Sequence, residues 1–242
     1  MIKKEYRKYF NESFFESINS EIKAYLLGFV FADGCVMNRM RGGRLGNEYG
    51  LQLNVAEKDK NIIYLFQQHI YPYSNINIVP SSIIRNKYIR NPQYRIAFYS
   101  KTLFNDLNNL GCEKRKTYKE NKIPNIPNNL IIHFIRGYFD GDGSVSLSIH
   151  RKYHKNKTYE YPYLNVAIVS KTNTILKDIQ NFLLYNDIKS SITYSNSKKY
   201  YELRINANES KVKLFELMYK DANFFFKRKY DIFKKIYKIM LS

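Results

Sequence analysis

Two segments of the chain carry the same short pattern, and this repeat constrains the fold more than any other feature. They are residues 25–34, YLLGFVFADG, and residues 134–143, FIRGYFDGDG. Each is an apolar run that holds two small residues four positions apart and ends on an aspartate and a glycine. Because residues four apart lie on one face of a helix, the pattern predicts two helices with a narrow face. Two such helices can pack backbone against backbone.

The aspartates of the repeat, Asp33 and Asp142, fall in the last turn of the two predicted helices. The glycine after each aspartate is expected to end its helix in the left-handed conformation. A helix C-terminus already carries partial negative charge and unpaired carbonyls. Two carboxylates brought together there repel each other unless a cation lies with them. The repeat therefore predicts a divalent-metal site where the two helices meet.

Basic residues greatly outnumber acidic ones in this chain. There are 40 Lys and Arg against 21 Asp and Glu, a formal net charge of +19. They are interleaved with 23 Tyr and 16 Phe rather than gathered in a tail. This distribution favours a folded surface that neutralises phosphates and contacts bases over an ordinary basic protein. Nucleic acid is the expected partner.

The small number of cysteines and the short apolar segments argue against several other classes of protein. Cys35 and Cys112 are too few for a disulfide framework, and no paired Cys or His spacing predicts a zinc site. No segment approaches the roughly 18 apolar residues that a membrane span needs. The first residues also lack the apolar core of a signal peptide. We expect a soluble, intracellular protein in a reducing compartment, without a membrane partner.

Further landmarks recur downstream of the two aspartates, which indicates a duplicated domain. Alternating residues predict strands with one buried face, and each half reads as helix, hairpin, helix, hairpin, helix. The pairs of matching segments are 51–56 with 163–167, the helix-like 58–70 with 172–186, and the second hairpins 76–100 with 188–206.

The predicted boundaries follow from this duplication. Residues 1–20 form an amphipathic lead-in without a counterpart, and residues 21–121 form the first half. Residues 122–129 hold two prolines that rule out a continuous helix, and they are the predicted linker to a second half at 130–242. Asn128 or Asn129 is expected to cap the second repeated helix.

The repeated helices, the strand-rich halves and the basic charge together resemble the LAGLIDADG homing endonucleases, in the single-chain form with two motifs. The resemblance implies an α+β fold of two pseudo-symmetric αββαββα units packed through the two motif helices. The antiparallel sheets would then form a DNA-binding saddle. It also implies an intron-encoded, monomeric, site-specific endonuclease that cuts both strands of a long asymmetric double-stranded DNA target and needs no protein partner.

The same resemblance implies a metal site at the ends of the motif helices. The acidic metal ligands of the family fall on Asp33 and Asp142, and the carbonyls of Ala32 and Gly141 would be further ligands. Mg²⁺ suits such oxygen donors with added waters, and two or three ions are expected near the scissile phosphates. Asp140 stands where the first motif has Phe31. We expect Asp140 to have a structural role at the helix interface.

Two basic residues are the remaining catalytic candidates implied by the resemblance. Lys116 and Lys229 match a basic residue that the family carries near the end of each half, and each follows an arginine. A positive charge there would stabilise the transition state. The opposing interpretation is that both are ordinary phosphate-contacting surface residues.

Strand parity counted from the aspartates predicts the side chains that face DNA. Arg with guanine, and Asn or Gln with adenine, are the usual pairings in the major groove. In the first half the set is Met37, Arg39, Arg41, Gln52, Asn54 and Arg95, and in the second half it is Ser146, Ser148, His150, Lys152, Asn165, Glu202, Arg204 and Asn206.

The main alternative is an RNA maturase that binds the intron RNA, with reduced or absent cleavage. A basic saddle would suit either substrate. The presence of both Asp33 and Asp142 favours retained chemistry, because a pure binder gains little from paired acids that face phosphates. A DNA-binding regulator and an intein are less favoured, since we find neither an additional binding domain nor flanking splicing segments.

Overall fold

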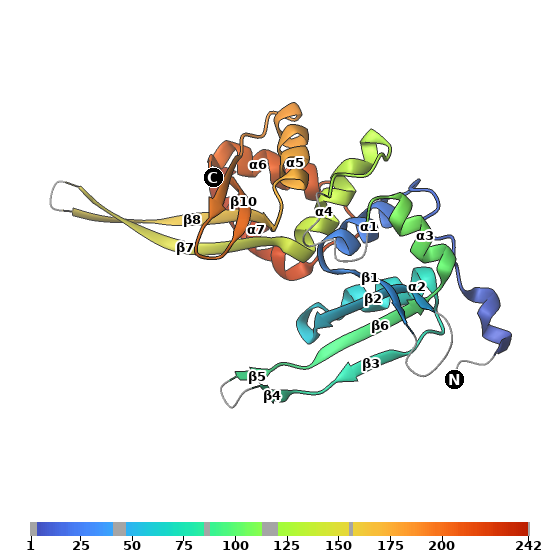
Figure 1. Ribbon diagram of the computed structural model, residues 1–242. Helices are drawn as coiled ribbons and strands as arrows, with labels where there is room; N and C mark the ends of the chain where they lie inside the picture. The colour runs from blue at the N-terminus through green and yellow to red at the C-terminus, as the bar shows by residue number, and fades with distance from the viewer. Residues whose placement is uncertain (1–3, 41–46, 85–87, 113–120, 155–156, 242) are drawn as a thin grey trace.

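The computed structural model describes residues 4–40, 47–84, 88–112, 121–154 and 157–241 (Figure 1). The lead-in segment contains the 3₁₀ helix η1 (Lys4–Tyr9). The first half comprises α1 (Glu21–Asp33), β1 (Cys35–Met40), β2 (Asn47–Ala56), the 3₁₀ helix η2 (Glu57–Asp59), α2 (Asn61–Ile70), β3 (Ile76–Val79), β4 (Ser82–Ile84), β5 (Tyr88–Arg90), β6 (Gln93–Tyr99) and α3 (Lys101–Asn109).

Among the described residues, the second half repeats the order of the α-helices and of the four strands of the main sheet, without counterparts of β4 and β5 and with α7 in addition. It comprises the 3₁₀ helix η4 (Asn128–Leu130), α4 (Ile131–Asp142), β7 (Gly143–His154), β8 (Lys157–Ser170), α5 (Thr174–Tyr185), β9 (Ser191–Ser195), β10 (Tyr200–Ile205), α6 (Asn208–Tyr219) and α7 (Lys227–Leu241). The helices after the first hairpins, α2 and α5, lie where the sequence predicts them.

Two four-stranded antiparallel sheets carry the same strand order. The first is β1-β2-β6-β3 and the second is β7-β8-β10-β9, while β4 and β5 form a separate small hairpin. Along β2, Leu51, Leu53 and Val55 are buried and the residues between them are only partly buried, which is the predicted alternation. The expected α+β fold with two alike units is therefore confirmed.

The two halves meet through α1 and α4, whose backbones touch. A Cβ placed on Gly28 would collide with the carbonyl oxygen of Phe134, and a Cβ on Gly137 would collide with that of Tyr25. A Cβ on Gly141 would run into the side chain of Ala32. The predicted packing of two narrow helix faces is confirmed, and it brings the C-terminal ends of α1 and α4 together.

The glycines that follow the two aspartates differ from the expectation. Gly34 has φ −73° and Gly143 has φ −87°, and both are extended rather than left-handed. The chain passes from each helix straight into a strand, so it needs no left-handed turn. Glycine is required there for space, because a Cβ on Gly34 would lie 2.8 Å from the Cα of Val30, and one on Gly143 would run into Phe139.

The expected cap of the second motif helix is also wrong. Residues Asn128–Leu130 form a turn of 3₁₀ helix that leads into α4, and Leu130 occupies the N-cap position without a side-chain hydrogen bond. The Leu130 N–H donates to the carbonyl oxygen of Pro127 at 2.8 Å. The preceding turn therefore continues into the helix, and an asparagine cap has no place.

The lead-in segment before α1 packs on the first half. Phe14 and Phe15 are buried, and the ring of Phe10 stacks on Tyr71 with centroids 4.8 Å apart. The Asn11 N–H donates to the carbonyl oxygen of Ile70 at 2.8 Å, at the end of α2. The segment thus extends the core on the side of the first half.

The hairpin of β7 and β8 extends beyond its sheet as an arm (Figure 1). Its pairing runs from Gly143 opposite Ile168 to His154 opposite Lys157. The outer side chains are exposed on both faces of the arm, with Ile149 at 67% and Tyr153 at 71% on one face and His150 and Lys152 exposed on the other. The outer part of this arm therefore contributes little to the core. Among the described residues, no helix combines the length and apolar character needed to cross a membrane.

Candidate active site and nucleic-acid interface

Asp33 and Asp142 are the last residues of α1 and α4. Because the two helices are in backbone contact, these ends meet, and a Cβ on Gly141 would lie 3.4 Å from Oδ2 of Asp33. The hydroxyl of Tyr138 has a raised pKa. Burial is the main cause, and the negative charges of Asp142 and Asp33 raise the pKa further. The two carboxylates therefore share one site.

A cavity of about 230 Å³ opens beside Asp142. It lies between the ends of the motif helices and the end of β8. Four of its lining residues were not singled out for this site by the sequence, namely Asn121, Tyr138, Lys171 and Tyr200. The other lining residues are Phe31, Ala32, Asp142, Val169 and Ser170. Only the folded chain brings Tyr200 to Asp142, since they lie far apart in sequence.

The donor set at this site fits a hard divalent cation. It offers two carboxylates and the carbonyls of a helix end, and Mg²⁺ prefers such oxygen ligands. The bare Cα of Gly141 leaves open the space between Ala32 and the Asp33 carboxylate that a Cβ would fill. Within the described ranges, no three His, Cys, Asp or Glu residues gather into a metal cage. A cation here would depend on water and phosphate for its remaining ligands.

Lys229 is buried beneath the same helix end. Its ammonium donates to the carbonyl oxygens of Phe139 at 2.6 Å, Asp140 at 2.8 Å and Gly143 at 2.6 Å. Burial lowers the pKa of Lys229 to about 8, while the carboxylates of Asp140 and Asp33 act in the opposite direction. The predicted catalytic lysine thus holds the last turn of α4. Lys116, the predicted counterpart, lies outside the described residues.

Asp140 has the structural role that the sequence indicated. It is 1% exposed, and its Oδ2 accepts hydrogen bonds from the Tyr25 hydroxyl and the Phe226 N–H, each at 2.8 Å. Burial raises the pKa of Asp140 to about 6, partly offset by Lys229 and the two hydrogen bonds. Asp140 therefore joins α4 to α1 and to the segment before α7.

Strand register places the predicted DNA-facing residues of the first half on one face of its sheet. Gln52 pairs with Cys35 and Asn54 with Arg95, on the face opposite Leu53. Arg39 is exposed and pairs with Glu48 at 3.1 Å. Met37 shares this face, opposite Gly50, but is only 4% exposed, so its side chain offers little surface for the expected contact. Arg41 lies outside the described residues.

The second sheet presents its own predicted set in the same way. Opposite pairs on this face are Ser146 with Asn165 and His150 with Tyr161, and Arg204 lies across from Ala167. The other predicted members, Ser148, Lys152, Glu202 and Asn206, have the same parity, and the Arg204 guanidinium pairs with Glu202 at 2.9 Å.

The sequence prediction did not include the tyrosines on this face. The ring of His150 stacks on Tyr163 with centroids 4.3 Å apart, and Tyr159 and Tyr161 follow outward along the arm. The signal was present, because tyrosine recurs at every second position over residues 159–163. The predicted set took Asn165 from β8 and did not include these rings.

Comparison with known proteins matches the second half to a family. Residues 129–219 match the family model of the LAGLIDADG-like domain. They form a LAGLIDADG-like domain. The matching stretch contains α4 with Asp142 at its end, and the first half carries the same order of elements. A comparison with curated protein sequences gives no match.

Solved structures share the fold over most of the chain. A variant of the homing endonuclease I-DmoI, in complex with its target DNA and in the presence of Mn, aligns with TM-score 0.56 and 20% identity, over 83% of this chain and 94% of that one. The meganuclease I-SmaMI bound to uncleavable DNA aligns with TM-score 0.61 and 15% identity, over 93% and 90%. The LAGLIDADG meganuclease I-AabMI bound to uncleaved DNA aligns with TM-score 0.61 and 15% identity, over 90% of each chain.

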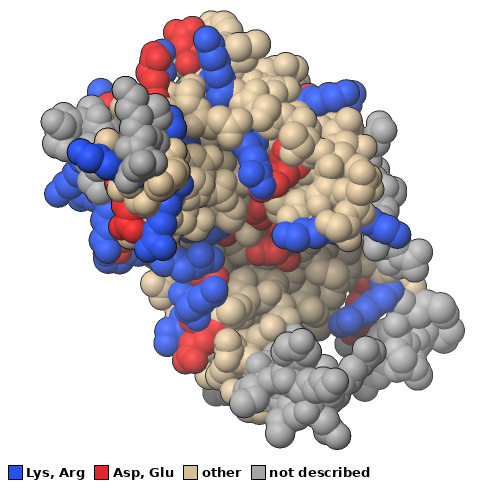
Figure 2. Space-filling model, turned by 90° about the vertical axis from the view of Figure 1, so that its left-hand side faces the viewer, with Lys and Arg blue, Asp and Glu red and all other residues tan. Residues whose placement is uncertain are grey.

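One face of the molecule is strongly charged. Figure 2 shows acidic side chains in a hollow near the middle of the view, with Lys and Arg side chains around it and along the projecting arm. Basic margins attract a polyanion and draw it toward the hollow. The acids at the centre would repel its phosphates unless a cation accompanies them.

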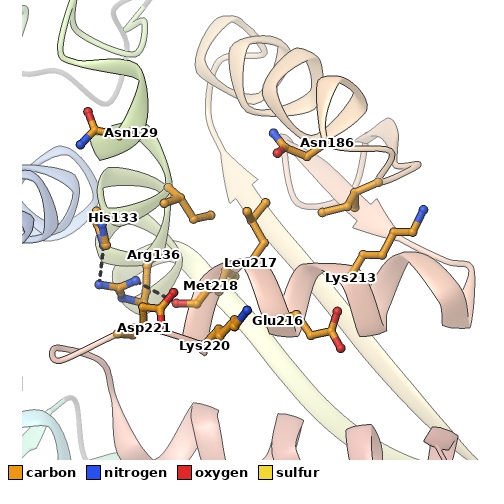
Figure 3. Close-up of a pocket in the computed structure, with 13 residues that line it drawn as sticks. Asn129, His133, Arg136, Asn186, Lys213, Glu216, Leu217, Met218, Lys220 and Asp221 are labelled. Carbon is orange, nitrogen blue, oxygen red and sulfur yellow. Dashed lines mark hydrogen bonds between the residues drawn. The ribbon is translucent and has the colours of Figure 1, made fainter.

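A second, larger pocket of the LAGLIDADG-like domain lies at the other end of α4 (Figure 3). It has a volume of about 490 Å³ between α4, the end of α5 and α6. Arg136 lines it, but its guanidinium donates to the carbonyl oxygens of Met218 and Phe224 and to Glu21, and it also contacts His133. This pocket lies away from the aspartates. The buried Arg136 guanidinium is already hydrogen-bonded to other parts of the fold.

Proposed function

We propose that this chain is a site-specific DNA endonuclease that hydrolyses phosphodiesters on both strands of a long asymmetric target with divalent metal. The observation that carries the proposal is the meeting of Asp33 and Asp142 at the touching ends of α1 and α4. The DNA complexes of I-DmoI, I-SmaMI and I-AabMI, which share this fold, support it. The proposed units are residues 21–121 and 130–242, joined by 122–129.

The proposed metal ligands are the two aspartates with the carbonyls of Ala32 and Gly141. Two or three Mg²⁺ ions bound there would activate water and stabilise the charge on the scissile phosphate and the leaving oxygen. The chain itself holds the two carboxylates at fixed separation through the α1 and α4 contact. Lys229 places a positive charge behind them, which favours the developing negative charge of the transition state.

The two sheets would bind the DNA on either side of this site. In the first sheet Arg39, Gln52, Asn54 and Arg95 are the proposed contacts. In the second sheet they are Ser146, Ser148, His150, Lys152, Asn165, Glu202, Arg204 and Asn206, with the neighbouring tyrosines. Arg, Asn and Gln on a sheet face suit the edges of bases in the major groove. We further propose that one chain suffices, because it carries both halves.

Cleavage of a plasmid tests this proposal directly. The purified chain is incubated with Mg²⁺ and a plasmid that carries an intron-free copy of the host gene, and linear product at one site is expected. Asp33→Asn and Asp142→Asn should still bind this DNA but lose at least about a thousandfold in cleavage rate, as expected when metal-bound charge stabilisation is lost. Cleavage at the wild-type rate by both variants would refute the metal assignment.

The alternative function for the same basic surface is that of an intron-RNA maturase. It predicts tight binding to the intron RNA together with no cleavage of DNA by the wild-type chain. The paired carboxylates at the centre of the surface favour the endonuclease, since they hinder phosphate binding in the absence of metal.

A further inference from the structure

Residues 223–229, here called the crossing segment, comprise the end of the connection between α6 and α7 and the first residues of α7, and they contact the two motif helices. The Asn223 N–H and its side-chain amide donate to Glu21 of α1 at 2.9 and 2.7 Å. The Phe226 N–H donates to Asp140 of α4 at 2.8 Å. The crossing segment therefore belongs to the second half but bonds to helices of both halves.

Arg228 extends this connection to the first sheet. Its Nε and Nη2 donate to the two carboxylate oxygens of Asp59 at 2.6 and 2.9 Å. Asp59 lies in η2, directly after β2, and its side chain is 13% exposed. A bidentate arginine and carboxylate pair fixes orientation as well as distance. The pair thus fixes the start of α7 relative to the first half.

The next residue carries this constraint to the active site. Lys229 follows Arg228 in the first turn of α7, and its ammonium bonds three carbonyls around the end of α4. Those carbonyls flank Asp142, because they belong to Phe139, Asp140 and Gly143. A connected path therefore runs from Asp59 through its ion pair with Arg228, along the backbone to Lys229, and through the Lys229 hydrogen bonds to the turn of α4 that bears Asp142.

We propose that Asp59 and Arg228 are positioning residues for cleavage, which set the location of Asp142 relative to Asp33 through Lys229. The proposal rests on the proposed endonuclease function and adds two residues to it. Their ion pair joins the two halves at the residue next to Lys229, and a displacement passed on to the end of α4 would separate the carboxylates. Rates of positioned reactions are sensitive to such displacements.

The test compares Asp59→Ala, Arg228→Ala and the exchanged double variant Asp59→Arg with Arg228→Asp. The control is Lys227→Ala, because Lys227 forms an ion pair of the same kind, at 2.6 Å to Asp231, but within α7. Single-turnover cleavage, the Mg²⁺ concentration at half-maximal rate, the DNA dissociation constant and the melting temperature are measured for each.

Both single variants are expected to cleave about tenfold more slowly and to need more Mg²⁺, with unchanged DNA affinity. The exchanged pair should recover most of the rate, and Lys227→Ala should behave as wild type. Asp59→Ala is decisive: if Arg228 only contacts a phosphate, removing Asp59 leaves the rate unchanged, and the proposal is overturned. If an alanine variant does not fold, Asp59→Asn and Arg228→Lys replace it, with the same expected shifts in rate and Mg²⁺ requirement.

The two proposals fail in different ways. A wild-type chain that cleaves no DNA overturns the endonuclease function, and the positioning role falls with it. A wild-type chain that cleaves while Asp59→Ala cleaves equally fast, with the same Mg²⁺ requirement, overturns the positioning role alone.

Discussion

At the scale of single residues, Asp140 shows how a change between two motif copies acquires a structural reason. The first motif has Phe31 at this position and the second has Asp140. The acid is buried, and it accepts hydrogen bonds from Tyr25 of α1 and from the crossing segment at Phe226. Burying a carboxylate costs free energy unless the group accepts hydrogen bonds. The fold must therefore hold Tyr25 and Phe226 in place beside Asp140.

The buried carboxyl predicts a pH dependence of stability. Its pKa rises from an ordinary 3.8 to about 6 on folding, so the folded chain holds this proton more tightly than the unfolded chain. The resulting stabilisation is complete below the unfolded pKa and is lost as pH rises through about 6. Relative to Asp140→Asn, the wild-type free energy of unfolding should fall between pH 4 and 6.5. Urea denaturation measures it, and parallel curves for the two proteins would contradict the assignment.

At the scale of elements, the contact of α1 with α4 depends on two glycines. Gly28 and Gly137 each face a backbone carbonyl of the other helix, where no Cβ has room. The helices must separate to admit even a methyl group. Separation at this point would also displace the ends that carry the aspartates.

Gly28→Ala and Gly137→Ala are therefore expected to destabilise the fold by about 3 kcal/mol or more each, at the upper end of overpacking effects. Gly111→Ala is the control. Nothing lies within 4 Å of the added Cβ at Gly111, although its φ is +87°, so only conformational strain of about 1 kcal/mol is expected. Urea or thermal unfolding measures all three, and equal losses at the three sites would contradict close helix contact.

At the scale of the whole molecule, net charge and the arm determine how the chain meets its partner. The formal charge is +19, and each phosphate contact releases counterions from DNA. DNA affinity should therefore fall by roughly a thousandfold or more between about 50 and about 200 mM salt.

An arm-shortened variant separates the contribution of β7 and β8. Replacing residues 150–161 by Asn-Gly preserves the pair of Ile149 with Pro162 and forms a two-residue hairpin turn. It removes Arg151, Lys152 and Lys157, which are exposed. Stability should change little, whereas DNA affinity and the salt slope should both decrease. Fluorescence anisotropy at several salt concentrations measures both, and an unchanged slope would argue against phosphate contacts by the arm.

Local patterns in the sequence predicted much of the fold. The small residues at helical spacing predicted the contact of α1 and α4, and the alternation in Leu51 to Val55 predicted which face of β2 is buried. These succeed because helix and strand periodicities are properties of neighbouring residues. The prediction that Gly34 and Gly143 are left-handed was wrong. Their conformation depends on how the chain enters each strand, and glycine is needed there for the space beside Val30 and Phe139.

The sequence by itself determined the duplication, the class of the fold and the location of Asp33 and Asp142 at the ends of two packed helices. Only the tertiary structure decided the burial of Met37, the three carbonyl partners of Lys229 and the pairing of Arg228 with Asp59. Each of those depends on contacts between segments far apart in the chain. Their geometry follows from how the two halves pack, and no local pattern of residue types encodes it.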